Sequence, residues 1–519
     1  MDKKWWTLLA VCVGTFMLLL DVTIVIVAIP EIQRGLHASF SNIQWVIDAY
    51  ALTLASFLLT AGVLADRYGR RRLFTIGLAI FTVGSLLCGV AQSPLMLILS
   101  RSGQGIGGAI MFATSLALLG QAFLGKDRGT AFGIWGAITG VAVSLGPILG
   151  GIITTGISWR GIFLVNVPIG IVGLAITWWK VEESRAADPG RPDWIGFVLL
   201  TTGLISFVYG LIRASETSWG DAGVITSLTL GVLLLAGFLF AESKVRYPMF
   251  DLSLFRTPTF DGGLIAAFCM NGSLFSVLLY LVLYLQNLLG YSALQTGLRI
   301  LLISASLMIS ATISGRLSER VPVRWLIGPG LIIVGVGLLL MTGLTATSEW
   351  THLIPGFIIS GLGAGLVNPP LASTAIGVVE PQRAGMASGV NTTFRQIGIA
   401  VSIAALGTIF TSSVQRNLHN LLAPVPGLSD HAQRIASAIR QGEASSAVSS
   451  VPASLRGQLE SAIRSSFTSG INELLVVTAV LALVGGVLSA ILIRNRDFVA
   501  RRAPEPSPKV TAQVVHGTA

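Results

Sequence analysis

Three ionisable side chains interrupt long apolar runs in the first part of the sequence: Asp21, Asp48 and Arg101. Ionisable groups inside a bilayer are costly and persist mainly where they pair with one another or line an aqueous path. A carboxyl group in such a place can carry a proton, because its charge becomes costly whenever the site closes to water. These residues therefore predict a proton-handling or ligand-binding site inside a membrane.

The composition requires a membrane around these residues. Of 519 residues, 53% are hydrophobic and 11% are charged, whereas soluble domains have roughly 25% charged residues. Many apolar runs can cross a hydrocarbon core about 30 Å thick. We predict fourteen spans, near 5–29, 43–64, 73–91, 95–119, 131–153, 162–179, 194–212, 222–241, 262–286, 294–314, 325–344, 352–376, 387–410 and 473–493. The chain is therefore an all-α polytopic membrane protein, which excludes a soluble enzyme, a disordered protein and a collagen.

The basic residues orient these spans. With both termini cytoplasmic, 23 of the 34 Lys and Arg fall in inside segments and four fall in short outside loops, as the positive-inside rule requires. The net charge of +10 is therefore a sign of topology, and we expect no nucleic-acid partner. A count of about 1.5 Å per residue places Asp21, Asp48 and Arg101 at roughly 8–12 Å depth in the outer half of the membrane, where they could share one cavity.

Two halves of the sequence echo each other. Gly62–Arg71 returns as Gly315–Arg324, and Ser102–Gly108 returns as Ser360–Leu366; the stretches after Arg128 and Arg383 are a weaker third echo. Parallel repeats of this kind build secondary transporters. We therefore divide the chain into a six-span half (1–180), two inserted spans with flanking loops (181–261), a second six-span half (262–498) and a disordered cytoplasmic tail (499–519). The second half contains a long external segment, 411–470, which we interpret as a solvated helical connector or, less readily, a lid.

Five stretches resemble the major facilitator superfamily, and within it the fourteen-span drug:proton antiporters. They are Leu20–Pro30 in span 1, Gly62–Arg72 after span 2, Arg101–Gly105 in span 4, Gly136–Gly151 in span 5 and Trp159–Pro168 at span 6. The loop stretch is typical of the whole superfamily, the span-5 stretch of its exporters and the span-1 stretch of this branch. One departure is Ile26, where the branch often has Asn.

The resemblance, together with the burial argument, assigns roles to the embedded polar residues. Asp21 is our candidate proton carrier, with Arg101 tuning its proton affinity; the alternative is a static ion pair. Asp48 suits contact with a cationic drug, and Asn166, Asn391 and Arg395 are the other expected substrate-cavity residues. Arg395 has no acid at comparable burial in its own half, so it could serve gating or substrate binding, or pair with backbone carbonyls.

Two further motifs are expected to move the halves. The resemblance makes Gly62, Asp66, Arg67, Gly69, Arg70, Arg71 and Arg72 a conformational latch, in which the Asp66 carboxylate faces a neighbouring helix N-terminus and pairs with arginine. The alternative for these arginines is a plain positive-inside anchor. In span 5, Gly136, Gly140, Gly146, Pro147, Gly150 and Gly151 predict a hinge and a tight seam; the alternative is ordinary kinking and packing.

The expected function is proton-coupled antiport that exports hydrophobic, cationic drugs from the cytoplasm across the plasma membrane. The alternative is a dedicated exporter of one neutral or anionic antibiotic or metabolite; uptake and a non-transporting receptor are less favoured. No phosphate-binding loop occurs in the sequence, so the energy must come from the proton gradient, and we expect no enzyme activity, cofactor or metal. The expected partners are protons, a small hydrophobic substrate and the lipid bilayer, and we expect a functional monomer.

Overall fold

The structure, a computed structural model, describes residues 2–123, 126–185, 193–245, 248, 252–318, 320–379, 384–423 and 453–498. Each of the fourteen predicted spans coincides with a helical segment in this part of the chain. The α-helices are α1 (Lys3–Leu36), α2 (Phe40–Tyr68), α3 (Arg70–Gly89), α4 (Pro94–Ala122), α5 (Lys126–Gly156), α6 (Gly161–Leu164), α7 (Asn166–Lys180), α8 (Trp194–Glu216), α9 (Ala222–Glu242), α10 (Pro258–Met270), α11 (Ser276–Leu283), α12 (Ala293–Leu317), α13 (Arg324–Leu339), α14 (Ile354–Gly377), α15 (Ala384–Leu422) and α18 (Ala453–Leu492). Two π-helical turns, η2 (Asn271–Phe275) and η3 (Tyr284–Leu288), join α10 and α11 into the ninth span. The 3-10 helices are η1 (Leu252–Arg256), η4 (Trp350–Leu353) and η7 (Asn495–Asp497).

Short polar loops fix where several helices begin. The side chains of Ser39, Ser93, Asp193, Asp221 and Ser292 each accept a hydrogen bond from a backbone N–H in the first turn of the following helix. Such caps satisfy donors that the helix itself leaves free. The caps therefore place the helix starts at the polar boundaries between apolar runs.

The helices have the length and surface of membrane spans. Among the described residues, eleven stretches are long and apolar enough to cross a membrane, and the bent helix α2 makes a twelfth. The remaining two predicted spans correspond to α5 and α13. Large apolar side chains stay exposed on the outside of the bundle, such as Leu233 and Phe240 of α9 at 63% and 68% exposure. Such a surface is stable against lipid and costly in water.

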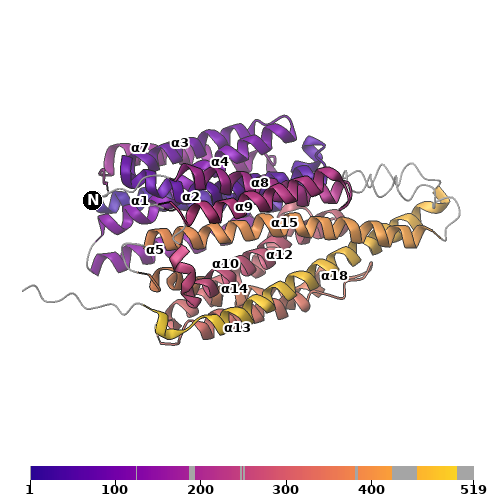
Figure 1. The fold of residues 1–519 in the computed structure, drawn as a ribbon. Helices are drawn as coiled ribbons and strands as arrows, with labels where there is room; N and C mark the ends of the chain where they lie inside the picture. The colour runs from indigo at the N-terminus through magenta and orange to yellow at the C-terminus, as the bar shows by residue number, and fades with distance from the viewer. Residues whose placement is uncertain are drawn as a thin grey trace, which may run out of the picture.

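The helices form two six-span halves with an inserted pair between them (Figure 1). In the first half α4 packs against both α2 and α3, and in the second half α14 packs against both α12 and α13. Helix α1 begins and α18 ends at the same end of the bundle, which we call the terminal end (left in Figure 1). The opposite end, where α1 ends and α2 begins, is called the distal end.

The internal repeat has a different register from the one that the sequence predicted in spans 4 and 12. An added Cβ at Gly107 of α4 would lie 2.5 Å from the backbone N of Phe81, and one at Gly363 of α14 would lie 2.7 Å from the backbone N of Val334. Phe81 and Val334 are separated by the same number of residues as Gly62 and Gly315, which begin the two copies of the first repeated motif. The motif comparison paired Gly107 with Gly365, so that alignment is wrong by two residues. Glycine-rich helices offer several matches, and the backbone contact decides between them.

The inserted pair covers one of the two seams between the halves. Helix α8 packs on both α2 and α15. The Phe57 and Phe197 rings lie 4.7 Å apart across the α2–α8 contact, and the Thr408 hydroxyl of α15 donates a hydrogen bond to the Leu211 carbonyl of α8 at 2.8 Å. The other seam, between α5 and α12, has no such cover in the described part of the chain.

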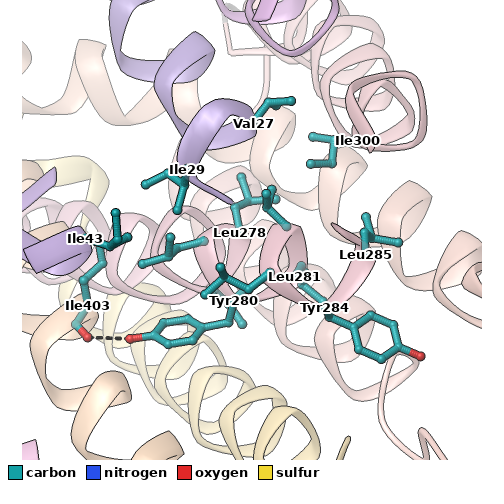
Figure 2. Packing of buried hydrophobic residues seen from close by; sticks show 14 of the residues in the cluster. Val27, Ile29, Ile43, Leu278, Tyr280, Leu281, Tyr284, Leu285, Ile300 and Ile403 are labelled. Atoms are coloured by element: carbon teal, nitrogen blue, oxygen red, sulfur yellow. Dashed lines mark hydrogen bonds between the residues drawn. The ribbon is translucent and has the colours of Figure 1, made fainter. Parts of the chain in front are cut away.

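The two halves are joined by an apolar cluster at the distal end, and a second mixed cluster joins them through α8. One apolar cluster at the distal end combines residues of both halves, including Ile43 and Ile403; Figure 2 shows these residues together with side chains of span 9. At the terminal end, one cluster around Phe74 belongs to the first half alone and another around Leu371 to the second half alone. The centre of the molecule is therefore closed toward the distal end.

Several predictions fall partly or wholly outside the described residues. These are Glu319 of the first echo, Arg383 of the third, the middle of segment 411–470 and the tail 499–519. Where segment 411–470 is described, it is helical, because α15 continues to Leu422 and α18 begins at Ala453.

Candidate functional site

Asp21 of α1 is the centre of a buried polar cluster. Its Oδ2 accepts a hydrogen bond from Nη1 of Arg101 at 2.5 Å, and the Asp21 and Arg101 side chains are 0% and 2% exposed. Its Oδ1 accepts hydrogen bonds from Nε2 of Gln104 at 2.9 Å and from Nδ2 of Asn166 at 3.3 Å. Gln104 also donates to Oγ of Ser85 at 2.7 Å. Helices α1, α3, α4 and α7 therefore converge on one carboxylate.

Arg101 is held on three sides. Its Nη1 also donates to Oε1 of Gln104 at 2.6 Å, and its Nε donates to the backbone carbonyl of Val46 on α2 at 3.3 Å. The guanidinium carbon lies 4.2 Å from the centre of the Tyr50 ring, within the range of a cation–π contact. The cluster thus ties α2 to the same carboxylate.

Glycines let α4 approach its neighbours closely enough to form this cluster. An added Cβ at Gly105 would lie 2.6 Å from the backbone carbonyl oxygen of Tyr50, and one at Gly84 would lie 3.0 Å from Cα of Gln104. Arg101 and Gln104 are separated by three positions on α4, so their side chains share one face of the helix. The span-4 motif therefore supplies both the donors and the space that brings them to Asp21.

Both oxygens of Asp21 are occupied in this cluster. One charged and two neutral donors point at them. The Asp21–Arg101 contact is a buried ion pair.

Asp48 of α2 is placed apart from this cluster. It is fully buried, and neither carboxyl oxygen has a hydrogen-bond partner among the described residues. One turn earlier, Gln44 donates to the Ile403 carbonyl of α15 at 3.0 Å, and the Tyr280 hydroxyl donates to the same carbonyl at 2.7 Å (Figure 2). Asp48 therefore lies on the helix that meets α15, not in a cavity shared with Asp21.

Arg395 of α15 pairs with two neutral side chains in the second half. Its Nε donates to Oδ1 of Asn391 at 3.2 Å, and its Nη1 donates to Oδ1 of Asn368 on α14 at 3.1 Å. Among the described residues it hydrogen-bonds to neither an acid nor a backbone carbonyl, so the structure differs from both of the simple pairings considered above. Asn391 is thus a partner of Arg395, whereas Asn166 belongs to the Asp21 cluster.

The latch residues lie at the terminal end, at the α2–α3 corner. Asp66 and Arg70 form an ion pair at 2.8 Å, and Arg70 also donates to Oε1 of Gln121 on α4 at 2.8 Å. Gly69 separates the helices with a φ of 115°, which favours glycine. Gly62 has open space around it, while Arg67 and Arg72 are exposed.

A different acid occupies the helix N-terminus that was considered for Asp66. Oε1 and Oε2 of Glu183, just after α7, accept hydrogen bonds from the backbone N–H groups of Arg71 at 3.0 Å and Arg72 at 3.1 Å. An added Cβ at Gly69 would lie 2.7 Å from Cδ of Glu183. The start of α3 is therefore capped by the segment that leads into the inserted spans.

This cap makes a prediction about stability. Replacing Glu183 by Ala should lower the free energy of unfolding by about 1 kcal/mol, because the carboxylate accepts two backbone hydrogen bonds at the positive end of α3. The measurement is thermal unfolding of the purified protein in detergent. Glu182→Ala is the matched control, since Glu182 is 69% exposed and pairs only with the exposed Lys3. Equal unfolding midpoints for the two variants would contradict the cap.

The span-5 motif packs against both halves. Helix α5 is continuous through Pro147. Gly146 lies against Thr23 of α1, and an added Cβ at Gly150 would lie 2.8 Å from the backbone carbonyl oxygen of Ile24. Gly136 and Gly140 lie on the same helix. This face of α5 is a seam within the first half.

The next residue of the motif forms the seam between the halves. An added Cβ at Gly151 would lie 2.6 Å from Cα of Leu294 on α12, and one at Gly297 would overlap the backbone carbonyl oxygen of Pro147. The N–H of Leu294 also donates to Oγ1 of Thr155 at 3.2 Å. Helices α5 and α12 are therefore in backbone contact near the distal end.

Sequence reasoning missed three residues of these sites: Ser85, Gln104 and Glu183. Gln104 carried a usable signal, because a polar amide three positions after a buried arginine shares its helix face. Glu183 lies outside the spans, where a single acid among charged residues gives no signal. Within the described residues no group of three His, Cys, Asp or Glu side chains could hold a metal ion.

Comparison with known families gives one match across most of the chain. The model described as "Major Facilitator Superfamily" matches residues 11–403.

Two relatives extend the match. Tetracenomycin C resistance and export protein of Streptomyces glaucescens is 32% identical over 516 residues, which cover 98% of this chain and 95% of that protein. Multidrug resistance protein Stp of Mycobacterium tuberculosis is 36% identical over 413 residues, covering 79% of this chain and 77% of that protein.

The fold is similar to a crystal structure of a bacterial homologue of the human lysosomal transporter Spinster, in an inward-facing and occupied conformation. The TM-score is 0.66 and the sequence identity 17%, and the match covers 95% of this chain and 98% of that one. At this identity the likeness concerns the fold.

Proposed function

Because this chain belongs to the major facilitator superfamily, we propose that it is a proton-coupled antiporter that exports hydrophobic drugs or antibiotics from the cytoplasm. The chain is a multi-pass membrane transporter and not an enzyme. The observation that carries the proposal is the buried Asp21–Arg101 pair with its two amide donors. Burying a charged pair inside a membrane span costs free energy, so such pairs persist mainly where the transport cycle uses them.

In the proposed cycle Asp21 exchanges its partners. When the distal end is open, a proton from outside binds Asp21 and Arg101 turns away, which releases the contact of α4 with α1. When the terminal end is open, the proton leaves and Arg101 returns to the carboxylate. Substrate crosses in the opposite direction by rocking of the two halves. Both termini are cytoplasmic and the membrane is the plasma membrane in this proposal.

The proposal has two forms, which differ in the charge of the substrate. Asp48 supports a cationic drug, because a buried carboxyl group without a partner can pair with a cation when the seam opens. The alternative, one neutral or anionic compound, is supported by Arg101, Tyr50 and Gln396 in the wall of a central cavity. The relatives include both forms, one being a multidrug resistance protein and the other a tetracenomycin C resistance and export protein.

The experiment that tests the function is accumulation of ethidium in inverted vesicles with an imposed proton gradient. We expect accumulation that a protonophore abolishes, because transport is coupled to proton movement. Vesicles without the protein are the control for passive uptake. If properly inserted protein moves no ethidium but moves a neutral compound such as tetracenomycin C, the dedicated exporter is correct; proton-independent transport of either compound contradicts the antiport itself.

A further inference from the structure

Two small cavities lie on either side of the centre of the bundle. The first has a volume of about 30 Å³ and lies between α1, α5, the ninth span and α12, with Pro147 and Ser304 in its wall. The second has a volume of about 40 Å³ and lies between α1, α2, α4, the ninth span and α15, with Arg101 in its wall. Two side chains line both cavities, Ile26 and Phe275. These two residues therefore form the partition between them.

Neither cavity can hold a drug-sized molecule by itself. Ligand pockets for such molecules have volumes of roughly 300–1,000 Å³. Binding of a drug-sized substrate at the centre of this molecule therefore requires one wall of these cavities to move. Moving the shared partition joins the two cavities, which together have about 70 Å³, and separation of the two halves has to supply the rest of the space.

Phe275 is better able to move than Ile26. Ile26 is β-branched and therefore stiff at χ1, and its helix is held by the close approach of Gly150 of α5 to Ile24. Phe275 is the last residue of the π-helical turn η2. Single π-helical turns occur frequently at functional sites in helices. Rotation of one aromatic side chain there leaves the backbone of α1 in place.

The two cavities differ in chemistry. The described wall of the first is apolar apart from two hydroxyl groups, those of Thr23 and Ser304. The wall of the second includes the polar side chains of Tyr50, Arg101 and Gln396. Arginine is a donor only, and tyrosine and glutamine can both donate. A molecule that spans both cavities would place its apolar body in the first and hydrogen-bond acceptors in the second.

We propose that Phe275 is a movable partition that joins the two cavities into one elongated pocket, and that this residue sets the size of the substrate. The substrate class is a flat hydrophobic molecule with an acceptor-bearing end, such as a carbonyl- or phenol-rich polycycle. This inference rests on the proposed export function and adds the position and shape of its substrate pocket.

The first test compares transport of two fluorescent probes, ethidium and the larger, carbonyl-bearing doxorubicin. Phe275→Trp fills the space of the partition, so kcat/KM for doxorubicin should fall about tenfold relative to ethidium. Phe275→Ala should raise the same ratio about tenfold. Phe268→Ala is the matched control, because Phe268 lies two turns earlier on the same span and lines neither cavity. An unchanged probe ratio in both Phe275 variants overturns the assignment.

A second test does not depend on transport. Removing the Phe275 ring should merge the cavities into one larger space that a small aromatic molecule can fill. Indole should then raise the thermal unfolding midpoint of purified Phe275→Ala, through binding to the folded state, but not that of the wild type or of Phe268→Ala. Equal indole responses in all three proteins overturn the partition. If the wild type transports neither probe, the proposed function fails for these compounds while the indole result still decides the partition.

Discussion

Asp21→Asn should abolish proton-driven accumulation, with a loss of about 100-fold or more. Asparagine has nearly the shape of aspartate, and its carbonyl oxygen can still accept a hydrogen bond from Arg101, so the cluster can remain folded. The asparagine side chain cannot bind or release a proton in the working pH range, so a proton can no longer take the place of Arg101 at this position. The measurement is ethidium or doxorubicin accumulation in inverted vesicles, normalised to the amount of inserted protein.

Asp48→Asn is the matched comparison, because Asp48 is also a fully buried carboxyl group of the first half. It forms no ion pair among the described residues, so its loss should leave proton coupling intact and raise KM for the cation ethidium more than for a neutral probe. The opposite pattern, with Asp21→Asn active and Asp48→Asn uncoupled, would assign the transported proton to Asp48. In that case the Asp21–Arg101 contact is the static ion pair considered as the alternative.

The spans could be predicted because a bilayer imposes a length on every helix. Runs of about 20 apolar residues are recognisable without tertiary context, and all fourteen coincide with helices. Helix ends outside the membrane have no such constraint: α15 was expected to end near residue 410 and extends to Leu422, and α18 begins at Ala453 rather than near 473. Polar residues there are compatible with both helix and loop, so the sequence alone does not mark the ends.

The height of the polar residues along their helices could be predicted, but the direction of their side chains could not. A rise of about 1.5 Å per residue gives the height of a side chain along its helix, which placed Asp21, Asp48 and Arg101 in one layer. Each residue also turns about 100° around the helix axis, and the rotation of α2 against α4 depends on tertiary packing. For this reason Asp48 lies apart from the cluster, and Asn166, assigned to the substrate cavity, donates to Asp21.

Arg101→Leu should be the most destabilising single change in the cluster. It leaves Asp21 buried beside two neutral amide donors with no compensating charge. Removing one partner of a buried ion pair costs about 3–5 kcal/mol, so we expect a large fall in the thermal unfolding midpoint and loss of transport. If Arg101 contributed only packing, Arg101→Leu would be tolerated, because the site is dry and enclosed by Tyr50 and Phe163.

The double variant separates the structural from the functional part of this effect. Adding Asp21→Asn to Arg101→Leu removes the uncompensated charge, so most of the lost stability should return, as neutral replacements of buried ion pairs are often tolerated. Transport should stay absent, because the group that binds the proton and the group that displaces it are both missing. Unfolding midpoints of the four proteins give the coupling energy between the two side chains. Recovery of proton-driven transport in the stable double variant would show that the pair only holds the helices together, and the coupling site would have to lie elsewhere.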